Sequence, residues 1–272
     1  MRAALAAIAS AALASAAAGT EAVDPLVDST LAALAAELDP RAASALASID
    51  GTGPRLLATR AYLRASSQLD GRWSWSAAEA VAFEASPGKR DLDAAIARVR
   101  CRFEADNPGH TLWVNPEFRS LDVQLERWNE NETIARAGEN LLSSVRRALT
   151  GSGSHPAGST ANVSLLRTVL LEHQPSPMPT LAAPGLSPHG RMRAIDFQVE
   201  SSGRIVAGTD SASIAADWIT AGWKARLRAA ISAADAGFQG PLASPDEPWH
   251  YEFRPEAGQG DPGHDSACAR AS

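Results

Sequence analysis

The sequence predicts an α+β protein, with a small and largely antiparallel sheet and a helix-rich N-terminal half packed on it. The first half of the chain carries alanine and leucine at helical spacing, which favours helices. By contrast, residues 195–200 and 249–253 alternate between apolar and polar side chains, the period of a strand with one apolar face. Because Ser201-Ser202-Gly203 follows the first alternating stretch, we expect a hairpin into a short strand at 204–207.

The helices of the first half are separated by recognisable breaks. Residues 26–38 predict a helix that ends at Asp39-Pro40, and residues 41–49 predict a second. A Gly/Pro-containing stretch at 50–54 interrupts the pattern before a third helix at 55–69.

Ser76, with Glu79 three residues later, is typical of a capping box and places a helix start there. Residues 91–106 predict an amphipathic helix, and 111–114 a short strand. The apolar face of that helix consists of Leu92, Ile96, Val99 and Phe103.

Beyond residue 114 we expect helices at 117–128 and 132–149, a strand-to-helix transition at 162–171 and a last long helix at 211–236. The Ser/Gly-rich stretch 151–159 predicts a flexible loop, so we interpret His155 within it as solvated. Residues 256–272, rich in Gly, Asp, Pro and Ala, predict a disordered tail.

Composition narrows the class of protein. With 272 residues, 45% hydrophobic and 21% charged, the chain has the balance of a globular protein of one large or two small domains. The net charge of −6 gives no overall basic bias, which argues against a nucleic-acid partner. The sequence leaves the oligomeric state open.

The N-terminus predicts export. Arg2 precedes an alanine-rich apolar run over residues 3–18, the pattern of a cleaved signal peptide, which we place at 1–19. The alternative is an alanine-rich membrane anchor, although the run is short for a bilayer span. We therefore expect a periplasmic or extracellular protein without stable membrane insertion after cleavage.

Two cysteines, Cys101 and Cys268, are present, and neither lies near another cysteine or a pair of histidines, so neither is interpreted as a metal ligand. An exported chain can oxidise them to a disulfide, but two free thiols fit the sequence equally well.

The residues that carry metal chemistry are His189, Asp196 and His250. Asp196 lies among apolar residues, and a carboxylate drawn into such surroundings needs a counter-charge. A metal ion provides one, and Arg193 or Arg204 is the rival partner. Three protein ligands that leave a fourth position open are typical of catalytic zinc.

Glu247 is the candidate general base. It precedes His250 by three residues, close enough to reach water at a metal site, where a carboxylate accepts the proton. The alternative is an ordinary surface residue beside Pro245 and Pro248. Since Pro248 disfavours a helix, this stretch does not form the helical His-Glu-x-x-His arrangement known from many zinc proteases.

Taken together, Ser187-Pro-His189, Ala194-Ile-Asp196 and Glu247-Pro-Trp-His250 resemble the two motifs of the VanY-type zinc D-alanyl-D-alanine carboxypeptidases. That group is related to the VanX-type dipeptidases and to Hedgehog-like domains. Its pattern is Ser-x-His-x-x-Gly-x-Ala-x-Asp followed by Glu-x-Trp-His. One departure is Met192, which stands at the usual glycine.

The resemblance implies one zinc ion and a peptidoglycan stem peptide as substrate. It spans residues 107–255, the expected zinc metallopeptidase domain, after a helical N-terminal region at 24–106. Arg167 is similar to the family arginine that holds the substrate carboxylate, with Arg119 in Phe118-Arg-Ser as its competitor. Ser187 resembles the family serine beside the metal.

We therefore expect a carboxypeptidase that hydrolyses the terminal D-Ala-D-Ala bond. Two alternatives stay open: an endopeptidase or L,D-carboxypeptidase with the same site, and a non-catalytic cell-wall binding module with a structural zinc. Glu247 separates the last from the others, because a structural zinc has no use for it. Glu200 and Glu252 lie outside the motifs and are interpreted as outer residues or solvated.

Overall fold

The structure, a computed structural model, describes residues 24–115, 118–151, 153, 155–234, 236–243 and 246–254. Within them the chain is α+β with a small antiparallel sheet, as the sequence predicts. The predicted signal peptide at 1–19 and tail at 256–272 lie outside the described residues. No helix among the described residues is both long enough and apolar enough to span a bilayer.

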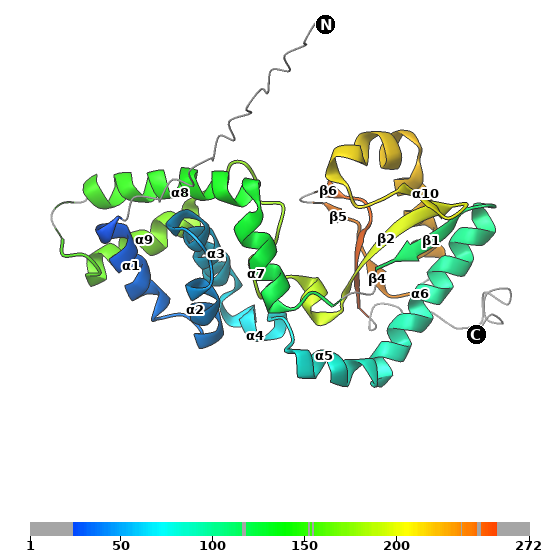
Figure 1. The fold of residues 1–272 in the computed structure, drawn as a ribbon, viewed down its shortest axis with the longest axis horizontal. Helices are drawn as coiled ribbons and strands as arrows, with labels where there is room; N and C mark the ends of the chain where they lie inside the picture. The colour runs from blue at the N-terminus through cyan, green and yellow to red at the C-terminus, as the bar shows by residue number, and fades with distance from the viewer. Residues whose placement is uncertain are drawn as a thin grey trace, which may run out of the picture.

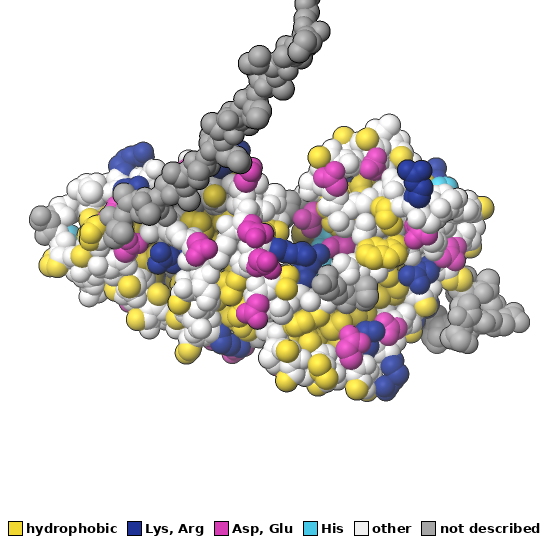
Figure 2. Space-filling model, in the orientation of Figure 1, with side chains coloured by type: hydrophobic (Ala, Val, Ile, Leu, Met, Phe, Trp, Pro, Cys, Tyr) yellow, Lys and Arg dark blue, Asp and Glu magenta, His cyan; other side chains and the backbone are white. Residues whose placement is uncertain are grey.

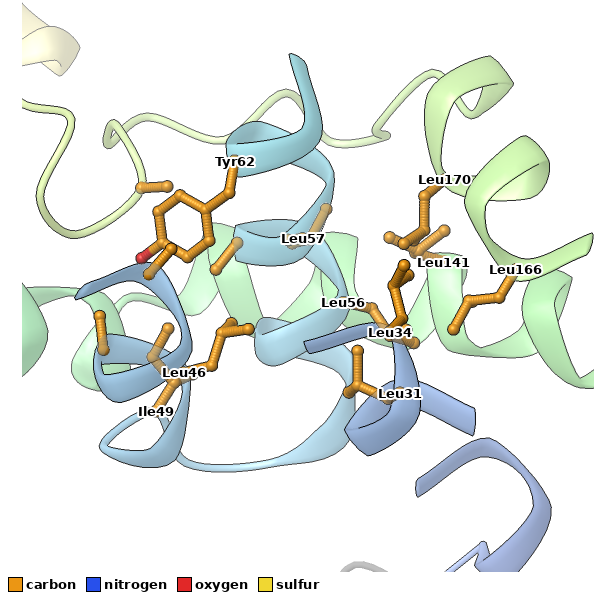
Figure 3. Close-up of a cluster of buried hydrophobic side chains, with 14 of the residues drawn as sticks. Leu31, Leu34, Leu46, Ile49, Leu56, Leu57, Tyr62, Leu141, Leu166 and Leu170 are labelled. Carbon is orange, nitrogen blue, oxygen red and sulfur yellow. The ribbon is translucent and has the colours of Figure 1, made fainter. Parts of the chain in front are cut away.

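The molecule has two lobes, and the first is helical (Figure 1). Its buried side chains form one hydrophobic cluster, the helical core, and Figure 3 shows Leu34, Leu56 and Leu141 meeting within it. The helices of this lobe are α1 (Pro25–Ala35), α2 (Pro40–Ala47), α3 (Thr52–Ala65), α7 (Leu121–Glu130), α8 (Glu132–Gly151) and α9 (Thr160–Glu172).

Local signals account for the first helices. Asp24 caps α1 and Asp39 caps α2, and each helix has proline in its first turn, where a missing N–H costs nothing. The predicted helices are thus confirmed to within a few residues. Helix α3 lies very close to α8, since a Cβ on Gly53 would lie 2.6 Å from the backbone of Gly138. Two glycines are required at that crossing.

The second lobe contains the sheet. Strands β1 (Thr111–Val114), β2 (Ala194–Ser201), β7 (His250–Phe253) and β4 (Phe238–Gln239) follow one another in space, and β3 (Arg204–Ala207) pairs with β2. Strands β5 (Leu242–Ala243) and β6 (Asp246–Glu247) pair with each other in a separate two-stranded sheet. All these pairings are antiparallel.

Two helices, α6 (Pro87–Asp106) and α10 (Trp223–Ala234), pack with this sheet around a second cluster, the sheet core. Phe197, Trp249 and Tyr251 belong to the sheet core, which confirms the apolar faces predicted for β2 and β7. Near the start of this lobe, Cys101 on α6 is disulfide-bonded.

The two cores divide the chain differently from the predicted boundary at residue 106. Helix α6 belongs to the sheet core, whereas α7, α8 and α9 belong to the helical core. The chain therefore passes between the lobes through η1 (Ser66–Gln68), α4 (Leu69–Arg72) and α5 (Ala77–Glu84), then after β1, and again after α9. Helical periodicity reveals a buried face but not the element that covers it.

Three predicted elements need correction. The helix expected at 211–236 is broken into η3 (Ser211–Ser213), the π-helix η4 (Ile214–Thr220) and α10, and Gly222 with φ of 79° separates the last two. Helix α7 begins at residue 121 rather than 117, because Ser120 caps it. Residues 162–171 lie wholly within α9, without a strand.

Candidate metal centre

The three predicted ligands meet between η2 (Pro188–Arg191) and two paired strands. His250 begins β7 and stands directly opposite Asp196 of β2 in the antiparallel register. Residues opposite each other in such a pair present their side chains on the same face. His189 arrives from η2, just before β2, and all three side chains are buried.

The separations between the ligand atoms fit a metal site. Nε2 of His189 lies 3.3 Å from Nδ1 of His250 and 3.4 Å from Oδ1 of Asp196, and Nδ1 of His250 lies 3.0 Å from that oxygen. Ligands about 2.0–2.1 Å from a tetrahedral zinc ion are separated by about 3.3 Å. The group can therefore hold a metal ion of that size with little rearrangement.

Electrostatics favour the ligating protonation states. Burial opposes ionisation of Asp196, but hydrogen bonds from His189 and His250 outweigh it and hold the pKa of this carboxyl far below its usual range. Burial lowers the pKa of His189, which keeps its imidazole neutral. A deprotonated carboxylate and a neutral imidazole are the forms that bind metal.

Asp196 has an arginine partner as well, and it is Arg119. The Nη2 of Arg119 donates to Oδ2 of Asp196 at 3.0 Å, while Oδ1 faces the two histidines. Neither Arg193 nor Arg204, the expected rivals of the metal, forms an ion pair with Asp196 in the described structure. Asp196 can therefore pair with Arg119 through Oδ2 and still offer Oδ1 to a metal ion.

Glu247 lies beside the triad. It ends β6, and its Oε2 is 3.7 Å from Nδ1 of His250. Burial raises the pKa of Glu247, which makes its carboxylate a stronger base. The pairing of β6 with β5 holds this residue beside the triad.

A cavity of about 710 Å³ opens over the group, between the two lobes. Its lining includes the triad, Glu247 and Ser187, which precedes η2. The structure thus brings the metal ligands, the candidate base and the predicted serine to one space.

Arg167 is not brought there. It lies on α9, pairs with Glu37 and is not among the residues that line the cavity. The expectation that Arg167 faces the substrate needs correction, because α9 directs this residue towards α1 and its connection to α2. Arg119, the competitor, does line the cavity.

Of the two other carboxylates considered from the sequence, one lines the cavity and one does not. Glu252 lines the cavity and pairs with Arg254, whereas Glu200 lies opposite Thr111 in the sheet and is not a lining residue. His155 is exposed, as expected.

A buried amide that sequence patterns missed supports the site. The Nε2 of Gln124 donates to Oγ of Ser74 at 2.9 Å and to the Arg119 carbonyl at 2.7 Å, and its Oε1 accepts from the Gly185 N–H at 3.0 Å. One side chain thus joins α7, the Arg119 backbone and the loop that leads to His189. The sequence could have indicated this burial, because Gln124 lies four residues before Trp128 and therefore on the same, buried face of α7.

The loop around His189 is tightly packed. The N–H of Trp75 donates to the Gly190 carbonyl at 2.7 Å, and a Cβ on Gly190 would lie 2.0 Å from Oγ of Ser74. Glycine is therefore required at position 190. Met192 closes η2 with φ of 50°, the left-handed conformation that glycine adopts without strain.

We expect Gln124→Ala to loosen this support. The substitution leaves the Gly185 N–H, the Arg119 carbonyl and Ser74 without a buried partner, at a cost of about 1–3 kcal/mol for each unsatisfied group. Chemical denaturation should show a lower free energy of unfolding, and metal titration a weaker affinity by about 10–100-fold, as for other supports of metal ligands. Gln68→Ala, at an exposed position, is the control and should change neither quantity.

Comparisons with protein families, with curated proteins and with solved structures found no match. The class of site is therefore defined by its geometry: a buried His-Asp-His group that can hold a metal ion, in an α+β protein.

Proposed function

We propose that the protein is a zinc-dependent peptidase. The observation that carries the proposal is the position of Glu247, which lies next to a three-ligand metal group and lines the same cavity. A structural metal site needs four protein ligands and no neighbouring base, whereas a catalytic site keeps a position open. Among the described residues, only three side chains form the group.

His189, Asp196 and His250 are the residues that would hold the metal. Zinc, when bound, supplies Lewis acidity that lowers the pKa of water and polarises a carbonyl oxygen. Glu247 accepts the proton of the attacking water on its carboxylate and delivers it to the leaving amine. Its raised pKa suits both steps, since the group must first take up the proton and then give it back.

Arg119 serves two purposes in this proposal. It orients Asp196 through Oδ2, and it places a permanent positive charge on the cavity wall beside the triad. A guanidinium there suits a substrate carboxylate, the role first expected of Arg167. Ser187, which also lines the cavity, offers a hydroxyl to the peptide backbone.

The resemblance to VanY-type enzymes supports a narrower assignment, hydrolysis of the terminal D-Ala-D-Ala bond of peptidoglycan stem peptides. Such a substrate lies outside the cytoplasmic membrane, consistent with the export signal expected at residues 1–19.

The assignment is tested with two synthetic stem pentapeptides that differ only at the C-terminus, one a free acid and one an amide. We expect the zinc-loaded wild-type protein to release one D-alanine from the acid and to act much more slowly on the amide. The reason is that the amide lacks the carboxylate that a charge-assisted pair with Arg119 requires. Mass spectrometry of the products measures both rates.

Arg119→Ala should reduce the rate on the acid far more than the rate on the amide, and Arg167→Ala should leave both unchanged. Equal cleavage of the two peptides by the wild type would indicate an endopeptidase. Absence of cleavage of either peptide would contradict the D-Ala-D-Ala assignment.

A further inference from the structure

The cavity has a second wall, contributed by the helical lobe and carrying only basic charges. Four arginines line it: two on α3, one on α4 and one on α7. We call this set, Arg60, Arg64, Arg72 and Arg127, the basic wall. In Figure 2, basic side chains lie at the junction of the two lobes, beside a histidine.

Charges in the cavity are separated by lobe. The acidic lining residues are Asp196, Glu247 and Glu252, and all three lie on strands of the sheet lobe. Of the described lining residues, none from the helical lobe is acidic. This separation is notable in a chain with a net charge of −6, in which carboxylates outnumber basic groups.

The arginines of the basic wall also form no ion pair with a carboxylate of the described residues. No carboxylate of the described residues lies within 4.0 Å of a guanidinium of the basic wall. Elsewhere on the same lobe arginines are paired: Arg41 with Asp39, Arg146 with Asp24 and Arg167 with Glu37. Arg55, Arg136 and Arg147 of this lobe also lack an ion pair among the described residues, but they do not line the cavity. What distinguishes the basic wall is that four guanidinium groups without a carboxylate partner line one cavity.

Two of these arginines are held in place by backbone oxygens. Nε of Arg60 donates to the His173 carbonyl at 3.0 Å, and Nη2 of Arg64 donates to the Leu171 carbonyl at 3.2 Å. Because the residues are one helical turn apart, their like charges repel. Burial, and after it the charge of Arg64, lower the pKa of Arg60.

Helix capping alone accounts for part of this arrangement, since arginines stabilise the C-terminal carbonyls of a helix such as α9. Arg72 and Arg127 lie in the last turns of α4 and α7, where a positive charge is also favourable, but no carbonyl of the described residues accepts a hydrogen bond from their guanidinium groups. Both are exposed, and both line the same cavity as Arg60 and Arg64. Helix-end stabilisation does not require that the four side chains line one cavity, whereas a ligand with several negative charges would contact all four there.

We propose that the basic wall is an anion subsite, which binds carboxylate groups of an acidic peptide away from the bond that is cut. The choice of a peptide rests on the proposed peptidase function, whereas the charge of the wall does not. Such a subsite would favour peptides that carry free carboxylates in addition to the terminal one, because each guanidinium offers a charge-assisted hydrogen bond.

The test is equilibrium binding to the full chain, measured by titration calorimetry with N-acetyl tetraglutamate amide and N-acetyl tetraglutamine amide. The neutral chelator 1,10-phenanthroline is present, so that binding does not depend on a metal. We expect the acidic peptide to bind at least about tenfold more tightly, and Arg60→Gln/Arg64→Gln to remove about tenfold or more of that affinity, as loss of one charged contact does.

The matched control is Arg136→Gln/Arg147→Gln. It makes the same change in net charge on exposed residues of α8 that do not line the cavity, and affinity should stay within about twofold. Arg127→Gln changes the basic wall without removing a hydrogen bond to the end of α9, and it should also weaken binding. If Arg60→Gln/Arg64→Gln does not fold, this variant provides the test.

Equal binding of the two peptides, or an equal loss in both double variants, would overturn the subsite. Inorganic phosphate that binds more tightly than tetraglutamate would overturn the carboxylate assignment in favour of a phosphate ligand. Because no hydrolysis is measured, failure here leaves the proposed reaction standing. Conversely, a protein that cleaves no peptide still reports on the basic wall.

Discussion

Replacement of Glu247 by alanine should abolish nearly all peptide hydrolysis while the metal stays bound. Loss of a general base typically costs on the order of 10²–10⁴ in rate. Glu247 approaches His250 but does not belong to the three-ligand group, so metal affinity does not depend directly on it. Steady-state kinetics on a stem pentapeptide, together with elemental analysis of the same sample, measures both properties.

Glu252→Ala is the matched control for this experiment. Glu252 lines the same cavity and is also a carboxylate, but it pairs with Arg254 and lies outside the motif. We expect its removal to change the rate by no more than a few-fold, in line with the small energies of exposed ion pairs. Near-normal turnover by Glu247→Ala would exclude this residue as the general base.

The second large effect is expected from His250→Ala, which should lose stoichiometric zinc. The wild-type chain is expected to bind about one ion, whereas the variant keeps only His189 and Asp196, too few for a catalytic site. Binding of zinc only to the folded state at 100 times its dissociation constant adds about 2.7 kcal/mol of stability. A chelator should therefore lower the wild-type Tm by about 5–10 °C and leave that of the variant almost unchanged.

His155→Ala serves as the control, because His155 is exposed and does not belong to the group. It should bind zinc as the wild type does. Undiminished zinc in His250→Ala would remove the metal assignment itself, and with it the proposed chemistry. Elemental analysis and thermal unfolding, with and without the chelator, give independent readings.

Much of the site could be predicted from the chain because the information is local. Alternation around Asp196 and His250 identifies two strands, and antiparallel pairing of such strands places the two side chains on one face. The motif around His189 then supplies the third ligand, and Glu247 follows from its distance to His250. These relations depend on neighbours a few residues apart and on one strand pairing.

Placement of the arginines could not be predicted in the same way. The sequence favours Arg167, with Arg119 as its competitor, yet Arg167 pairs with Glu37 and Arg119 pairs with Asp196. The choice depends on how α9 and the segment before α7 are oriented by the helical core. A long, flexible side chain on a helix can face any direction that packing allows.

By itself, the sequence determined the α+β class, the strands and the three residues of the candidate metal group, because each is encoded by short local patterns. Only the tertiary structure decided that α6 joins the sheet core, that Gln124 bonds the loop before His189 and that four arginines line the same cavity as the His-Asp-His group. The physical reason is the range of the interactions. Periodicity specifies which face of an element is buried, whereas the partner of that face, and any cavity left between partners, depends on the packing of the whole chain.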